Sequence, residues 1–178
     1  ELAAYRGRFP AGRFAADAQY REAAAHYALN EPDPALAILA DWLERRPPEH
    51  AQRGEVFSLQ GDVWVALRRE DEAVAAYEQA LKHPLSTEGR GYVLDELTRL
   101  HVAHREFEAA SRRWEETVAG DPDPVFLVQA AYWIGRLRLQ AGDAAGAVSR
   151  MAELVRPHLD HPKREDVERV LLEVARAA

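Results

Sequence analysis

Two pairs of histidines have a type and spacing that could support metal chemistry. His101 and His104 lie three residues apart, as do His158 and His161. Histidines at this helical spacing can share a metal ion, but a metal centre needs further ligands, and none is evident near either pair. His101 also takes the place that Trp64 holds one repeat earlier. We therefore interpret it as a packed, hydrogen-bonded histidine and predict no metal site.

No combination of nucleophile, base and acid supports catalysis. No serine lies in a nucleophile-elbow context, and no glycine-rich phosphate loop follows a strand, because no strand is predicted. The carboxylate pairs Glu115–Glu116 and Asp121/Asp123 are expected on an exposed face and in a capping turn. We expect no enzymatic activity and no cofactor. The serines considered are Ser58, Ser86, Ser111 and Ser149.

The tryptophans could suggest a ligand box, but most have a simpler interpretation. Trp42, Trp64 and Trp114 fall on positions that hold packing residues in the repeat described below, so we assign them to the core. Trp133 has no such assignment.

Composition limits the class of protein. The chain has 178 residues, which is enough for one compact domain or a short repeat array. A hydrophobic content of 47% argues against disorder. The net charge of −7 argues against binding to nucleic acid or to an anionic membrane surface. No apolar run approaches the length of about 18 residues that crossing a membrane requires.

The absence of cysteine excludes disulfides and thiolate metal sites, and it leaves the compartment open. The chain begins with Glu1 rather than Met and shows no signal-peptide pattern. We therefore expect a piece of a longer protein that has lost any targeting signal.

Two ladders of residues recur with nearly one period and indicate an internal repeat. The prolines are spaced by 37, 37 and 38 residues, and the alanines by 38, 37 and 37. The ladders consist of Pro10, Pro47, Pro84 and Pro122, and of Ala35, Ala73, Ala110 and Ala147.

Helical periodicity places two helices in each repeat, and we predict an all-α fold. Asp33 is the predicted N-cap and Pro34 the first residue of the second helix. Residues 84–91 are a predicted linker. The predicted units are a half unit at 1–10, helix pairs at 12–47, 52–84, 90–122 and 124–158, and a terminal capping helix at 163–178. Within them, helices are predicted at about 12–30, 34–45, 52–68, 71–82, 107–119, 125–141 and 144–158.

Close helix packing explains the small residues of the repeat. Two helices approach closely only where side chains are small, and aromatic side chains then fill the wider ends. The predicted small residues of the first helices are Ala23, Gly61, Thr98 and Gly135, and each faces the alanine of its partner helix.

These residues resemble the tetratricopeptide repeat (TPR). The second unit matches most fully, and the third and fourth match in part. The first unit is weaker, because Trp42 stands where a small residue is usual. The period of 37–38 residues exceeds the usual 34 of the family. The matching residues are Phe57, Gly61, Trp64, Ala73, Tyr77, Ala80 and Pro84; Leu97, Phe107, Ala110, Trp114 and Pro122; Ile134, Gly135, Ala147 and Met151; and Ala23, Ala35, Leu39 and Pro47.

The segments YRGRFPAGRFAADAQYREA and AAYWIGRLRLQAGDAAGAV also resemble bacterial envelope versions of the repeat, the Tol–Pal coordinator and outer-membrane assembly lipoproteins. This resemblance favours the periplasm over the bacterial cytoplasm. The TPR resemblance implies a right-handed α-α superhelix, with about four helix hairpins and first helices lining the concave side.

Equivalent positions of the first helices then define a groove. It has an apolar floor, aromatic ends and a pair of guanidinium groups. Such a groove suits an extended or helical peptide that carries a carboxylate. The alternative is a solvated surface on which Arg99 and Asp95 form an ordinary pair. The predicted rows are Ala24, Asp62, Arg99 and Arg136; Tyr20, Ser58, Asp95 and Tyr132; and Tyr27, Val65, Val102 and Leu139.

The sequence therefore predicts a non-enzymatic scaffold that binds a protein or peptide of unknown identity, without nucleic acid and without membrane insertion by this segment. The family's Lys/Asn clamp for a C-terminal carboxylate is not recognisable. One alternative is a structural module of a bacterial envelope complex that self-associates or docks. Another is a recruiting appendage of an enzyme encoded elsewhere in the full-length chain.

Overall fold

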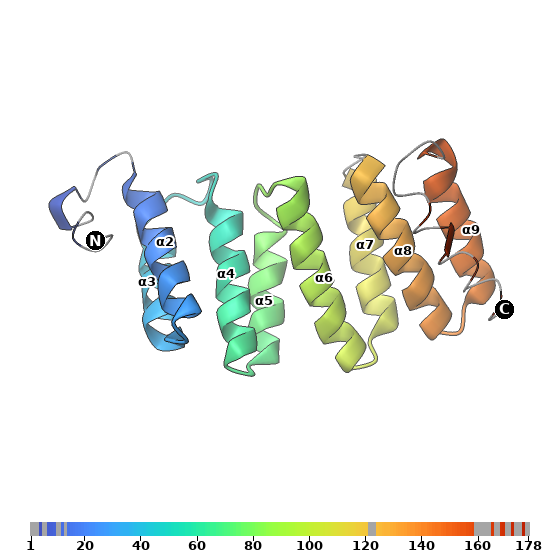
Figure 1. Ribbon diagram of the computed structural model, residues 1–178, viewed down its shortest axis with the longest axis horizontal. Helices are drawn as coiled ribbons and strands as arrows, with labels where there is room; N and C mark the ends of the chain where they lie inside the picture. Colours follow the sequence, from blue (N-terminus) through green and yellow to red (C-terminus); the bar gives the residue numbers. More distant parts are fainter. Residues whose placement is uncertain are drawn as a thin grey trace. The chain divides into compact units, whose positions relative to one another are not determined.

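The structure, a computed structural model, describes residues 14–120 and 124–158 continuously, together with residues 4, 7–9, 12, 165, 168, 169, 172 and 176. Within these residues it contains eight α-helices, one short 3-10 helix and no strand. The predicted half unit at 1–10 and the predicted terminal helix at 163–178 lie largely outside the described residues, as does His161. The helices are α2 (Ala15–Ala28), α3 (Pro32–Arg45), α4 (Arg53–Ala66), α5 (Glu70–Ala80), α6 (Thr87–Ala103), α7 (Phe107–Gly120), α8 (Pro124–Gln140), α9 (Ala144–Val155) and η1 (Arg156–His158) (Figure 1).

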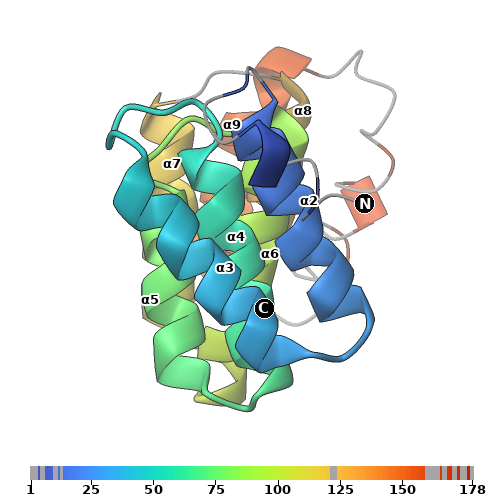
Figure 2. The same cartoon turned by 90° about the vertical axis from the view of Figure 1, so that its left-hand side faces the viewer.

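The chain divides into two compact units, Glu1–Val93 and Leu94–Ala178. In the first, α2 packs against α3 and α4 against α5, and α3 also contacts α4. The paired helices lie side by side and run in opposite directions (Figure 2). In the second unit, α8 packs against both α7 and α9. The predicted all-α class is confirmed for the described residues.

Two helices begin earlier than predicted. Helix α3 begins at Pro32 with Glu31 as its N-cap residue, so Asp33 lies inside the first turn and makes no capping bond. Pro32 already satisfies the preference for proline at the start of a helix, where no backbone donor is needed. Helix α6 begins at Thr87, inside the predicted linker. The Ser86 hydroxyl accepts a hydrogen bond from the backbone N–H of Gly89 at 3.0 Å, which is an N-cap contact.

One turn closes every helix pair. A residue with positive φ lies two positions after the end of each first helix: Asn30 (59°), Arg68 (58°), Arg105 (62°) and Gly142 (88°). In each turn that residue's N–H bonds back three positions, and the next N–H bonds back five positions, at 2.8–3.0 Å. This is the Schellman pattern, which satisfies the last carbonyl groups of a helix. Because the same two hydrogen bonds form around one positive-φ residue in each turn, these four helix pairs share the same connection.

A side-chain contact spans the same five positions in every turn. His26 Nδ1 lies 2.6 Å from Glu31 Oε2. In the next repeat, the Arg69 guanidinium lies 4.7 Å from the Trp64 ring centroid. The third and fourth repeats use His101 with Glu106 at 2.7 Å and Arg138 with Asp143 at 3.6 Å. His101 is thus packed and hydrogen-bonded, as predicted. Chemically different pairs perform one task, which is to tie the first helix to the start of the second.

Small residues permit the predicted close packing inside the hairpins. A Cβ added to Gly61 would lie 2.5 Å from the buried Tyr77 ring, and one added to Gly135 would lie 2.0 Å from Met151 Sδ. Thr98 has a second role, because its hydroxyl accepts a hydrogen bond from the buried Trp114 indole at 2.8 Å. These contacts fix the depth at which each second helix sits, and they leave the opposite face of the first helix for other contacts.

Candidate interaction surface

Each first helix presents a stripe of residues at spacings of three, four and three, which lie on one face of an α-helix. The predicted rows supply three positions of each stripe. The structure adds a fourth position, one turn earlier, that the sequence analysis missed. The stripes are Asp17, Tyr20, Ala24 and Tyr27 on α2; Glu55, Ser58, Asp62 and Val65 on α4; Tyr92, Asp95, Arg99 and Val102 on α6; and Gln129, Tyr132, Arg136 and Leu139 on α8.

In the first unit, Asp62 accepts two tyrosine hydrogen bonds on the same oxygen. The hydroxyl groups of Tyr77 and Tyr92 donate to Asp62 Oδ1 at 2.6 and 2.7 Å. Burial raises the pKa of Asp62, while the two hydroxyl groups act in the opposite direction. No Lys, Arg or His among the described residues forms an ion pair with this carboxylate. Asp62 is thus a partly desolvated acid without a counter-charge from the described residues.

Tyr20 lies in the electrostatic field of the same carboxylate. Burial is the main cause of its raised pKa, and the negative charges of Glu55 and Asp62 add to it. Glu55 is exposed and has no ion pair among the described residues. Asp17 is neutralised by Arg21 at 2.8 Å, on the side of α2. The stripe of α4 therefore carries two carboxylates that no described cation compensates.

Apolar and aromatic side chains beside these acids are accessible to a partner. Tyr27 and Val65, which are repeat equivalents, are each 37% exposed, and Tyr92 is 45% exposed. Single exposed apolar residues are ordinary on a protein surface. Tyr27 and Val65 occupy equivalent stripe positions, and Tyr92 bonds to Asp62, which together distinguish this face.

In the second unit, Asp95 is held by residues from α8. The Gln129 amide donates to its two carboxylate oxygens at 3.3 and 3.2 Å. Burial raises the pKa of Asp95, and hydrogen bonds from Trp133 and Gln129 lower it in part. Trp133, which had no assignment from sequence, thus contacts a residue of the predicted groove.

The two predicted guanidinium groups are each engaged within their own helix. Arg99 pairs with the largely buried Glu96 at 2.6 Å, rather than forming the ordinary pair with Asp95 that the alternative interpretation assumed. Arg136 lies 5.4 Å from the Tyr132 ring centroid and donates a hydrogen bond to its hydroxyl. Arg136 remains exposed, so it can still contact a ligand, but its orientation is set by Tyr132.

Among the residues that sequence analysis missed, Tyr92 and Gln129 contact predicted site residues directly. Both belong to the added stripe position and bond to Asp62 and Asp95 from the next first helix. Helical spacing could have identified them. A residue three positions before Asp95 or Tyr132 lies on the same face of its helix, and these residues are Tyr92 and Gln129. The predicted rows did not include this position.

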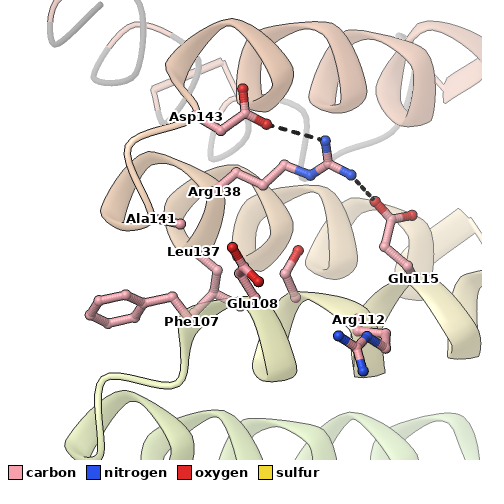
Figure 3. A pocket seen from close by; sticks show the side chains of 9 residues that line it. Phe107, Glu108, Arg112, Glu115, Leu137, Arg138, Ala141 and Asp143 are labelled. Carbon is pink, nitrogen blue, oxygen red and sulfur yellow. Dashed lines mark hydrogen bonds and ion pairs between the residues drawn. The ribbon is translucent and has the colours of Figure 1, made fainter.

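A separate cavity of about 350 Å³ lies between α7, α8 and the turn into α9 (Figure 3). Arg138 joins Glu115 to Asp143 across it, and Arg150 binds Glu115 through two nitrogens at 2.7 and 2.9 Å. Phe107 lies at one side of this cavity, as Figure 3 shows. The ion pairs connect three helices of the second unit, so we interpret the charges here as structural.

The described part of the chain offers neither a metal site nor a membrane span. The described residues contain no cluster of His, Cys, Asp or Glu that could hold a metal ion. None of the helices in the described part of the chain is both long and apolar enough to cross a bilayer.

Antiparallel helix pairs, identical turns and alternating small and large packing residues together define a TPR-like helical repeat protein. No protein-family model matches the sequence, and no curated protein matches it. Solved structures of TPR-type proteins share the fold. MamA aligns with a TM-score of 0.61 and 16% identity over 91% of this chain and 89% of its own.

Two further structures agree. TPR-like repeats of a putative kinesin light chain from Podosopora anserina give a TM-score of 0.62 and 20% identity, covering 90% of this chain and 85% of that one. YrrB, described as a TPR protein with an unusual peptide-binding site, aligns with a TM-score of 0.59 and 18% identity, covering 99% of this chain and 91% of its own. These identities establish the fold, whereas the resemblance to envelope proteins stays a prediction.

Proposed function

We propose that this chain is a non-enzymatic scaffold that binds a peptide or protein partner through the exposed stripes of its first helices, those of α2 and α4 in the first unit and that of α8 in the second. The supporting observation is the repeated exposure of Tyr27, Val65 and Tyr92 beside polar groups that the core does not use. Binding surfaces for peptides combine apolar contact area with a few oriented polar groups. YrrB, which shares the fold, is described as having a peptide-binding site.

Peptides selected from a random phage-displayed library on the full chain would test this proposal. We expect binders whose affinity falls at least about tenfold with Val65→Glu or with the pair Arg99→Glu and Arg136→Glu, because a charge is buried or reversed at the contact. Titration of the synthetic peptides by fluorescence anisotropy would measure the change.

Second-helix substitutions supply the controls. Arg112→Glu reverses an exposed charge on α7, and Gln79→Glu adds a negative charge to the exposed surface of α5. Both variants should bind the selected peptides with full affinity. Retention of every selected peptide by all stripe variants would contradict the proposal.

A further inference from the structure

We propose that Asp62, together with Tyr20, Tyr77 and Tyr92, forms a site for a cationic Lys or Arg side chain of the peptide partner. This inference rests on the proposed function and specifies the chemistry of its ligand. It differs from the sequence-based expectation of a carboxylate-bearing peptide, which relied on Arg99 and Arg136.

The first step is the missing counter-charge. Asp62 is held by two hydroxyl groups on Oδ1, and no hydrogen bond from a described residue reaches Oδ2. Tyrosine hydroxyl groups orient a carboxylate but do not neutralise it. A partly buried carboxylate is stabilised most by a cation that hydrogen-bonds to it directly, and charge-assisted hydrogen bonds are about twice as strong as neutral ones.

The second step is the aromatic surround. The half-exposed Tyr92 ring and the half-buried Tyr20 ring come from the neighbouring first helices α6 and α2, and Tyr77 comes from the partner helix α5. Aromatic faces attract ammonium and guanidinium groups through the ring quadrupole, and they also contact the aliphatic stems of Lys and Arg. Tyrosines on several sides of one carboxylate thus match both parts of such a side chain.

The third step is the sign of the surrounding charge. Glu55 and Asp62 lie two turns apart on the α4 stripe, with Ser58 between them, and their negative charges raise the pKa of Tyr20. Arg21, the cation beside Tyr20, is already paired with Asp17. This face of the first unit therefore repels a carboxylate and attracts a basic peptide segment.

A double-mutant cycle tests the direct contact. Peptides selected on the full chain are compared with versions in which each Lys becomes norleucine or each Arg becomes citrulline. Asp62→Asn preserves an acceptor for both tyrosines but removes the charge. We expect Asp62→Asn to weaken a basic peptide about tenfold or more, and to weaken its neutral version by less than about twofold.

The control is an Asp→Asn substitution at a position away from the stripe. Asp71→Asn alters an exposed acid in the first turn of α5, away from the stripe, and should leave the affinity of every peptide unchanged. Asp62→Asn should also retain the circular-dichroism spectrum of the wild type, so that lost binding is not lost structure.

The outcomes separate this inference from the proposed function. If peptides bind in a manner sensitive to Val65→Glu, yet Asp62→Asn leaves basic peptides within about twofold of wild type, the cation site is wrong and the scaffold stands. If Asp62→Asn weakens basic and neutral versions equally, Asp62 only organises the two tyrosines, and the inference is also wrong. If no peptide binds the wild-type chain, both proposals fail.

Discussion

Individual residues in this protein divide into two groups by the face of the helix on which they lie. Gly61 and Tyr77 are packing partners, as their types and spacing predicted, and the Gly135–Met151 pair repeats the arrangement. Asp62, next to Gly61 in sequence, lies on the outward stripe and bonds to the hydroxyl of the same tyrosine. Tyr77 therefore fills the core with its ring and orients a surface carboxylate with its hydroxyl. One side chain links the fold to the candidate site.

The pH dependence of stability should reveal the burial of Asp62. Because its pKa in the folded protein is raised above the ordinary value near 3.8, the folded state binds the proton more tightly than the unfolded state. Stability from this group is then present below the ordinary pKa and is lost as pH rises through the folded-state value. Tyr77 and Tyr92 act on Asp62 directly, Asp62 acts on Tyr20, and Glu55, Arg21 and Asp17 are the other charged groups that act on Tyr20.

Asp62→Asn does not titrate, so it isolates this contribution. We expect the free energy of unfolding of the wild type, relative to Asp62→Asn, to decrease between about pH 4 and about pH 7. Urea unfolding of both proteins across this range would measure the difference, with Asp71→Asn as the exposed control. A difference that increases with pH would mean that the tyrosine hydrogen bonds outweigh burial.

At the scale of helices, sequence predicted the elements well because packing and connection both leave periodic signals. The alanine ladder located every second helix, since each of its four alanines is buried in one of them. The first residues of the helices were harder to predict. Two prolines separated by one residue, Pro32 and Pro34, offered alternative first positions for α3, and the Ser86 cap of α6 lay among residues typical of a linker. The partner of Asp95 depends on side-chain directions between helices, and Arg99 has two acids, Asp95 and Glu96, within one turn of its own helix; spacing alone specifies neither partner.

The shared turn allows a direct measurement of backbone strain. Arg68, in the turn that follows α4, has φ of 58° and is exposed. A Cβ in this left-handed conformation costs about 1–2 kcal/mol, and glycine avoids that cost but gains entropy in the unfolded state. We expect Arg68→Gly to be about 0.5–1 kcal/mol more stable than Arg68→Ala. Both variants delete the same side chain beyond Cβ, so the comparison isolates the backbone term.

Thermal and urea unfolding of the two variants would measure this difference. The reciprocal change, Gly142→Ala, places a Cβ at φ of 88° and should destabilise the protein by about 1 kcal/mol. Equal stability of Arg68→Gly and Arg68→Ala would show that the turn relaxes when its side chain is removed.

At the scale of the whole molecule, the two compact units have separate buried centres. Trp42 and Tyr77 are fully buried in the first unit, and Trp114 and Ile134 in the second. In a repeat protein, stability is approximately a sum of local terms and of interfaces between neighbours, so different segments can open with different free energies. Damage to one centre should therefore remain largely within its own unit.

Trp114→Leu tests this locality. It removes the indole that donates to Thr98 and leaves a cavity in the second unit, which should cost about 2–4 kcal/mol. Native-state hydrogen exchange should then accelerate at least about thirtyfold for the slowest amides of α7–α9, because each 1.4 kcal/mol is a factor of ten. The slowest amides of α2–α5 should change much less. Equal acceleration in both units would instead show that the chain unfolds as one cooperative body, and that a ligand held by α2 and α4 would stabilise α8 and α9 to the same extent.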